Sequence, residues 1–142
     1  MYKHILVPVD LDSSYDWEHT LPMAIGLAQA HGGKLHIMTV VPEFGMSIVG
    51  QFFPGGFEKD VATKILATLK DRTKEAVPED LSVQNIVSEG SVYESIIRMS
   101  KQTTADLIVI GAHRPELRDY LLGPNAARVV RHADCSVLVV RD

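Results

Sequence analysis

Five short runs rich in apolar residues are spaced along the chain, and each predicts a β-strand. The runs cover residues 4–9, 34–41, 82–87, 106–111 and 136–140. The run at 106–111 is almost continuously apolar, which is typical of a strand buried on both faces, whereas residues 82–87 alternate. The runs therefore predict a sheet whose central strands are covered on both sides.

Stretches with helical periodicity separate these runs. Apolar residues recur at positions 21, 24, 25 and 28, and two glycines at 32–33 follow as a stop signal. Similar stripes predict a helix over about 58–76, another from Val92 through Met99 and a short one through Val129 and Val130. Pro22 is tolerated only in a first turn, so the first helix is expected to start near Thr20, and residues 13–19 are not assigned.

Strands that alternate with helices predict parallel pairing with right-handed crossovers, and hence an α/β three-layer sandwich. With 142 residues, 46% of them hydrophobic, one domain over 1–142 is expected. Ligands of such sheets bind beyond the carboxyl ends of the strands. The segments to search are 8–10, 40–42 and 111 onward.

Charge and hydropathy exclude several classes of partner. The net charge of −4 lacks the positive field that captures a phosphate backbone, so nucleic-acid binding is not expected. No apolar stretch has the length of a signal peptide or a membrane span, so a cytoplasmic protein with no membrane contact is expected. The single cysteine, Cys135, cannot form an internal disulfide, which suits a reducing compartment.

The segment from Gly111 to Asn125 predicts an anion site. Gly111-Ala112-His113-Arg114-Pro115 follows a strand, and Gly123-Pro124-Asn125 opens a helix. Glycine permits close backbone approach to a ligand, and the first amides of a helix attract phosphate. The alternative is that Gly111 only turns the chain and that Gly123-Pro124 only starts the helix.

Four segments of the chain together resemble the universal stress protein family. They are 5–10, 35–41, 106–111 and 131–141, so the resemblance extends over essentially the whole sequence. It implies a Rossmann-like parallel sheet of five strands in the order 3-2-1-4-5 with four helices, and a homodimer or higher homo-oligomer.

The phosphate loop departs from the pattern of the ATP-binding members. Gly111 matches the first glycine, but Arg114 replaces the second, only eight residues separate Arg114 from Gly123, and Pro124 stands where a hydroxyl residue is usual. Proline offers no N–H, whereas the Arg114 guanidinium restores positive charge. His113 and Asn125 are further donors. The loop is similar to a family branch with a His-Arg-Pro loop, some members of which bind ATP.

By the same resemblance, Asp10 faces the ribose hydroxyls, Val40 offers backbone groups to adenine, and Pro8 and Val9 line the base. A carboxylate suits vicinal hydroxyls because it accepts from both. The alternative for Asp10 is a turn or helix-initiating role. The implied ligand is ATP, or ADP or AMP, with Mg²⁺ as its companion ion.

Motifs for catalysis are sparse. The six histidines show no metal-ligand spacing, and one cysteine cannot build a cysteine-rich zinc site, so neither a metal site nor a catalytic residue is predicted. His132, Asp134 and Cys135 are close in sequence, but Cys135 is expected to be a small core residue. At most weak ATP hydrolysis is expected.

Two function hypotheses follow. The first is a regulatory or stress-protective protein that binds ATP, and the alternative is a nucleotide-independent interaction protein acting through its dimer surface, which Pro124 favours. The apolar strand 137–140 at a sheet edge predicts a homodimer. The segment 42–57 holds all four phenylalanines and is expected to form a subunit contact or nucleotide lid, unless it folds back onto its own domain.

Overall fold

The computed structural model describes residues 1–41, 56–112 and 125–141, with side chains of 56–60 excepted. Its strands are β1 (His4–Pro8), β2 (Lys34–Val41), β3 (Val83–Glu89), β4 (Leu107–Gly111) and β5 (Ser136–Val140). Its helices are a π-helical turn η1 (Asp16–Thr20), α1 (Leu21–His31), α3 (Gly56–Ala76), α4 (Val92–Gln102) and α5 (Asn125–His132). The predicted elements are all found, with small shifts at their ends.

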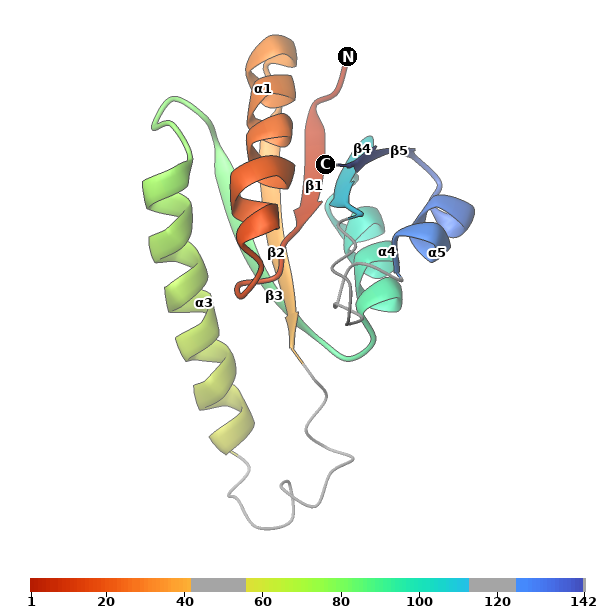
Figure 1. Ribbon diagram of the computed structural model, residues 1–142. Helices are drawn as coiled ribbons and strands as arrows, with labels where there is room; N and C mark the ends of the chain where they lie inside the picture. The colour runs from red at the N-terminus through yellow and green to blue at the C-terminus, as the bar shows by residue number, and fades with distance from the viewer. Residues whose placement is uncertain (42–55, 113–124, 142) are drawn as a thin grey trace.

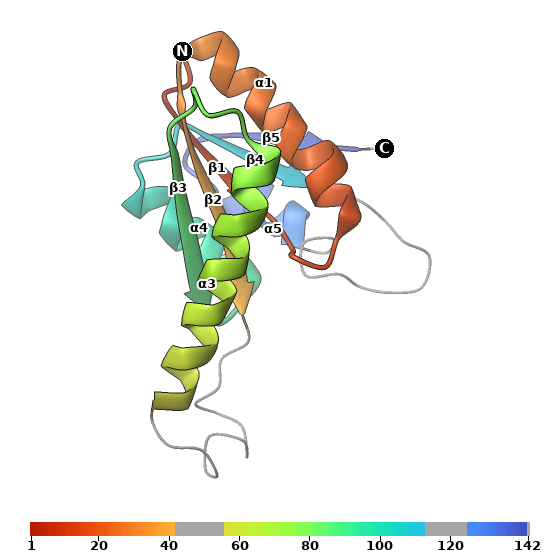
Figure 2. The same ribbon diagram turned by 90° about the vertical axis from the view of Figure 1, so that its left-hand side faces the viewer.

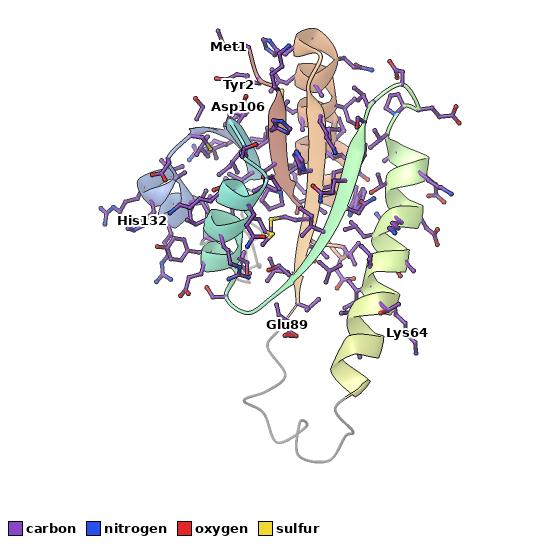
Figure 3. All side chains as sticks on the ribbon, turned by 180° about the vertical axis from the view of Figure 1, so that it is seen from behind. Met1, Tyr2, Lys64, Glu89, Asp106 and His132 are labelled. Carbon is purple, nitrogen blue, oxygen red and sulfur yellow. The ribbon has the colours of Figure 1, made fainter. Side chains whose placement is uncertain are left out.

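The five strands form one parallel sheet in the order β3-β2-β1-β4-β5. This confirms the predicted Rossmann-like order of 3-2-1-4-5. Ile5 of β1 is in register with Leu35 of β2 and Leu107 of β4, so β1 is the centre of the sheet. Figure 3 shows Tyr2 and Asp106 near the amino end of the sheet and Glu89 at the opposite, carboxyl end.

Each face of the sheet is covered by its own pair of helices (Figure 1). On one face, α1 and α3 bury apolar side chains against alternate residues of the strands, such as Ile5, Val7 and Val109. On the other face, α4 and α5 pack over the intervening residues, such as Leu6 and Ile108. Both faces of β1 and β4 are buried, which explains why their sequences are continuously apolar. Figure 2 shows the layers from the side.

Helix α1 starts at Leu21, as predicted near Thr20, and most of the unassigned residues before it are helical as well. Residues 14–15 are already helical, and the N–H of Leu21 bonds to the carbonyl of Asp16, five residues back, as in a π-helical turn. Pro22 follows directly and has no N–H to continue an α-helical ladder at that point. The turn therefore widens before α1, and Asp16, its first residue, is buried.

A buried histidine lies on the same face of β2 as Met38. The His36 side chain is only 4% exposed, with its Nδ1 2.6 Å from Oε1 of Gln84 and its Nε2 3.0 Å from Nδ1 of His4. Burial lowers the pKa of His36 below its ordinary value; the Gln84 hydrogen bond opposes this shift, and the charges of His4 and Lys34 add to it. His36 is therefore held in its neutral form near neutral pH.

Candidate functional site

The carboxyl ends of β1, β2 and β4 meet at one edge of the sheet. The fold brings five predicted site residues to this edge, because the three strands are parallel and β2 and β4 flank β1. They are Pro8, Val9, Asp10, Val40 and Gly111. All are buried except Asp10, which is half-buried. This edge is where a sheet of this kind leaves a crevice between neighbouring connections.

Val40 presents its backbone past the end of β1. The N–H and C=O of every second residue in a strand point to the same side. The Met38 carbonyl points toward β1 and accepts the N–H of Val9 at 2.8 Å. The N–H and C=O of Val40 also point toward the β1 side, but the pairing of β1 with β2 ends at Pro8 and Met38. Within the described strands, Val40 therefore has a donor and an acceptor with no ladder partner on that side.

Asp10 closes a tight turn and keeps one carboxylate oxygen available. Its Oδ1 accepts the N–H of Asp12 at 3.0 Å, and its carbonyl accepts the N–H of Ser13 at 3.0 Å. The alternative role in a turn is therefore real. No described residue donates to Asp10 Oδ2, and the side chain is half-buried, so the turn orients the carboxylate without occupying it fully.

A second carboxylate, that of Asp16, fixes the Asp10 turn through a hydrogen bond. This residue was not identified from the sequence. Asp16 is 3% exposed; its Oδ2 accepts the N–H of Asp10 at 2.9 Å and its Oδ1 accepts the hydroxyl of Thr20 at 2.9 Å. A buried carboxylate persists only when it is hydrogen-bonded in this way. The i, i+4 spacing of Asp16 and Thr20 was the one available signal.

Gly111 is required by packing against this same turn. A Cβ at Gly111 would lie 2.5 Å from Oγ1 of Thr20, 2.8 Å from Oδ1 of Asp16 and 3.3 Å from Cε1 of Tyr15. The absence of a side chain thus lets η1 approach the end of β4. Gly111 does more than turn the chain, because it joins the β4 edge to the turn that carries Asp10.

Helix α3 supports the next residue of the turn. One Nη of Arg72 donates to the carbonyl of Leu11 at 3.1 Å, and the guanidinium carbon lies 4.3 Å from the centre of the Trp17 ring. Cation–π contact and hydrogen bond together tie α3 to η1 and to the residue after Asp10. The turn that carries Asp10 is therefore positioned by the hydrogen bonds of Asp16 and Arg72 and by the close packing at Gly111.

The phosphate end of the predicted site lies largely outside the described residues. These positions are His113, Arg114, Gly123 and Pro124, and the segment 42–55 with Phe44, Phe52 and Phe53 is outside them as well. Asn125 begins α5 and is half-buried. Gly111 and Asn125 thus mark the two ends of the predicted phosphate loop.

Away from this edge, the described residues show no sign of a reactive thiol, a metal cluster or a membrane-spanning helix. Burial raises the pKa of the Cys135 thiol, and the carboxylates of Asp106 and Asp134 raise it further, which disfavours a thiolate nucleophile. Over 1–41, 56–112 and 125–141, no three His, Cys, Asp or Glu side chains gather as a metal site would require. None of the helices in these ranges is long and apolar enough to span a bilayer.

Comparison with known proteins agrees with this architecture. The model of the universal stress protein family matches residues 1–141. Universal stress protein G of Salmonella typhimurium is 32% identical over 143 residues, covering 99% of this chain and all of that protein. Universal stress protein UspA from Lactobacillus plantarum superposes with a TM-score of 0.74 at 26% identity, covering 99% of this chain and 98% of that one. A universal stress protein solved in complex with cAMP superposes with a TM-score of 0.66 at 25% identity, covering 99% of this chain and 97% of that one. The chain belongs to the universal stress protein family.

Proposed function

We propose that this protein binds an adenine nucleotide, with ATP as its main ligand, at the carboxyl edge of the sheet. The observation that carries the proposal is the Val40 backbone, whose donor and acceptor face past the end of β1. Adenine presents a ring-nitrogen acceptor beside an amino donor, which is the complementary pair. Pro8 and Val9, buried at the end of the neighbouring strand, supply the apolar flank for the base.

The ribose is assigned to Asp10. Its Oδ2 has no donor among the described residues, and its backbone is fixed by the 2.9 Å bond to Asp16. A fixed carboxylate accepts from a ribose hydroxyl with little loss of side-chain entropy. Asp16 acts through Asp10 and is a positioning residue.

The phosphates are assigned to the loop between β4 and α5. This part of the proposal rests on the sequence pattern and on the position of Gly111 at the same edge as Asp10 and Val40. Its residues are Gly111, His113, Arg114, Gly123, Pro124 and Asn125. Arg114 would provide the charge-assisted bonds that Pro124 cannot, with Mg²⁺ as a companion of the triphosphate.

The proposed role is regulatory binding in the cytoplasm, with at most weak hydrolysis. The family includes a protein solved with cAMP, which is also an adenine nucleotide. In this proposal both carboxylates have binding roles, since Asp16 accepts the N–H of Asp10 and the hydroxyl of Thr20, and Asp10 Oδ2 is assigned to the ribose. Such an arrangement favours binding over proton transfer.

We further propose a homodimer formed along β5. This strand is at one end of the sheet, and Val137, Leu138 and Val139 are only half-buried in the monomer. Pairing of two copies would satisfy the unpaired side of the strand and cover these side chains.

The assignment of Asp10 is tested by calorimetric titration of ATP into Asp10→Asn and Asp12→Asn. Asparagine keeps an oxygen for the Asp12 N–H but removes the charge, so Asp10→Asn should weaken ATP by about tenfold or more. Asp12 is exposed and loses the same charge two residues away, so its variant should bind like the wild type. Equal affinities of the two variants would remove Asp10 from the site.

A further inference from the structure

We propose that the groove between α4 and α5 is a docking site for an acidic segment of a partner protein. The groove has a volume of about 530 Å³ and is lined by Tyr93, Ala127, Arg128, Arg131 and His132. It lies on the face of the sheet opposite α1 and α3, and none of its described lining residues is assigned to the nucleotide. The proposal thus goes beyond nucleotide binding.

The basic side chains gather on one side of α5. Arg128, Arg131 and His132 follow the i, i+3, i+4 spacing that brings side chains together on a helix, and all three are exposed. His132, labelled in Figure 3, lies on the outer side of the α4–α5 layer. The basic side chains gathered here contrast with the net charge of −4 of the whole chain.

Tyr93 of α4 forms an aromatic platform for two of these basic side chains. The guanidinium carbon of Arg128 lies 5.8 Å from the centre of the Tyr93 ring, and the His132 ring centre lies 5.4 Å from it. Both contacts hold the polar ends of the side chains beside the groove. Tyrosine and arginine are also among the residue types most enriched where proteins bind one another strongly.

The positive charges in the groove lack acidic partners within the described part of the chain. Neither arginine nor His132 forms an ion pair there; the salt bridge found nearby joins Lys101 and Asp134, at 3.9 Å. Arg131 occupies the last turn of α5, where a cation interacts favourably with the helix dipole. That explanation does not extend to Arg128, which is in the middle of the helix and stacks on Tyr93.

Charge and shape select the occupant. A long polyanion such as DNA would be repelled by the net negative charge of the rest of the surface, whereas a short acidic segment needs only this groove. Carboxylates pair with guanidinium groups through two parallel hydrogen bonds, and Arg128 and Arg131 offer two such groups one turn apart. The fitting partner is a peptide segment with at least two Glu or Asp residues.

The test is the fluorescence anisotropy of a labelled peptide of alternating Glu and Ala, titrated with the full chain at low salt. The expected result is saturable binding that an Arg128→Gln, Arg131→Gln double variant weakens by about fivefold or more. Lys64→Gln removes a charge from exposed α3, far from His132 in Figure 3, and should leave the affinity unchanged. A Gln-Ala peptide should not bind.

Four outcomes overturn the proposal. The first is that the Glu-Ala peptide shows no saturable binding, and the second is that Lys64→Gln weakens binding as much as the double variant does. The third is that inorganic phosphate or ATP displaces the peptide at the same concentration as free Glu-Ala peptide does. The fourth is that the double variant loses the mass of a dimer. The third would mean a general anion site and the fourth a contact between copies of this chain. Because the assay needs no nucleotide, its result is independent of whether ATP binds at the edge of the sheet.

Discussion

Replacing Gly111 with alanine should disturb the contact between β4 and η1. The added Cβ would lie 2.5 Å from Thr20 Oγ1 and 2.8 Å from Asp16 Oδ1, closer than real Cβ atoms approach other heavy atoms. Thr20 and Asp16 are 0% and 3% exposed and are joined by a 2.9 Å hydrogen bond, so neither side chain can simply rotate away. The turn itself must move, and with it the bond from Asp16 to Asp10.

The expected cost is a balance of two terms. Overpacking of a dense core typically costs about 1–3 kcal/mol. Against this, alanine restricts the unfolded chain and returns about 0.4–1 kcal/mol. Gly111→Ala should therefore lower the free energy of unfolding by about 1–2 kcal/mol, measured by urea unfolding followed by circular dichroism. ATP affinity should fall as well, because the Asp10 turn is displaced.

A double-mutant cycle locates the clash. Thr20→Ala removes the atom at 2.5 Å, so Gly111→Ala should be less costly in that background, with a coupling of about 1 kcal/mol. Gly26→Ala is the matched control, because its Cβ would meet nothing within 4 Å and alanine favours a helix interior, so this variant should be at least as stable as the wild type. A Gly111→Ala protein of unchanged stability, or strict additivity with Thr20→Ala, would refute the packing argument.

Three further predictions address the rest of the fold. Burial lowers the pKa of His36 in the folded state, so as the pH falls the unfolded chain binds a proton at this residue at a higher pH than the folded chain does. The free energy of unfolding should therefore keep its full value above about pH 6.5 and decrease below it by at most about 1.4 kcal/mol per pH unit. His36→Gln should flatten that part of a pH series of urea midpoints, and an unchanged pH dependence would contradict the burial argument. Arg72→Ala removes the guanidinium over the single tryptophan, Trp17, and should change its emission spectrum and lower stability by about 1–2 kcal/mol, whereas an unchanged spectrum would contradict the stack. Val139→Asp should convert a dimeric mass in light scattering to a monomeric one without loss of helical dichroism; a wild type that is already monomeric would reject the β5 interface.

The fold was predictable because its hydrophobic pattern is nearly unambiguous. The run at 106–111 corresponds to β4 over 107–111, and all five strand residues are buried, as a continuous apolar run requires. The edge strand β3 was predicted to end at 87 but extends to Glu89. Its last two residues, Ser88 and Glu89, pair with Val40 and Val41, and such pairing depends on the backbone of β2 and not on polarity.

The candidate site was only partly predictable. Parallel topology brings Asp10, Val40 and Gly111 together, and that follows from the strand pattern. Asp16 could not be found in the same way, since it lies in a polar stretch and its burial depends on internal hydrogen bonds such as those from Thr20 and the Asp10 backbone. Whether a polar residue is exposed or internally bonded depends on tertiary contacts that a hydrophobic pattern does not encode.

The most direct test of the central claim is calorimetric titration of ATP into protein shown by mass spectrometry to be free of nucleotide. Binding at the edge of the sheet predicts saturable heat, and stabilisation of the native state by about 2.7 kcal/mol at a hundredfold excess of ATP over its dissociation constant. The stabilisation should appear as a rise in the melting temperature under the same conditions. No saturable heat and no thermal shift at millimolar ATP would contradict the claim that this protein binds the nucleotide.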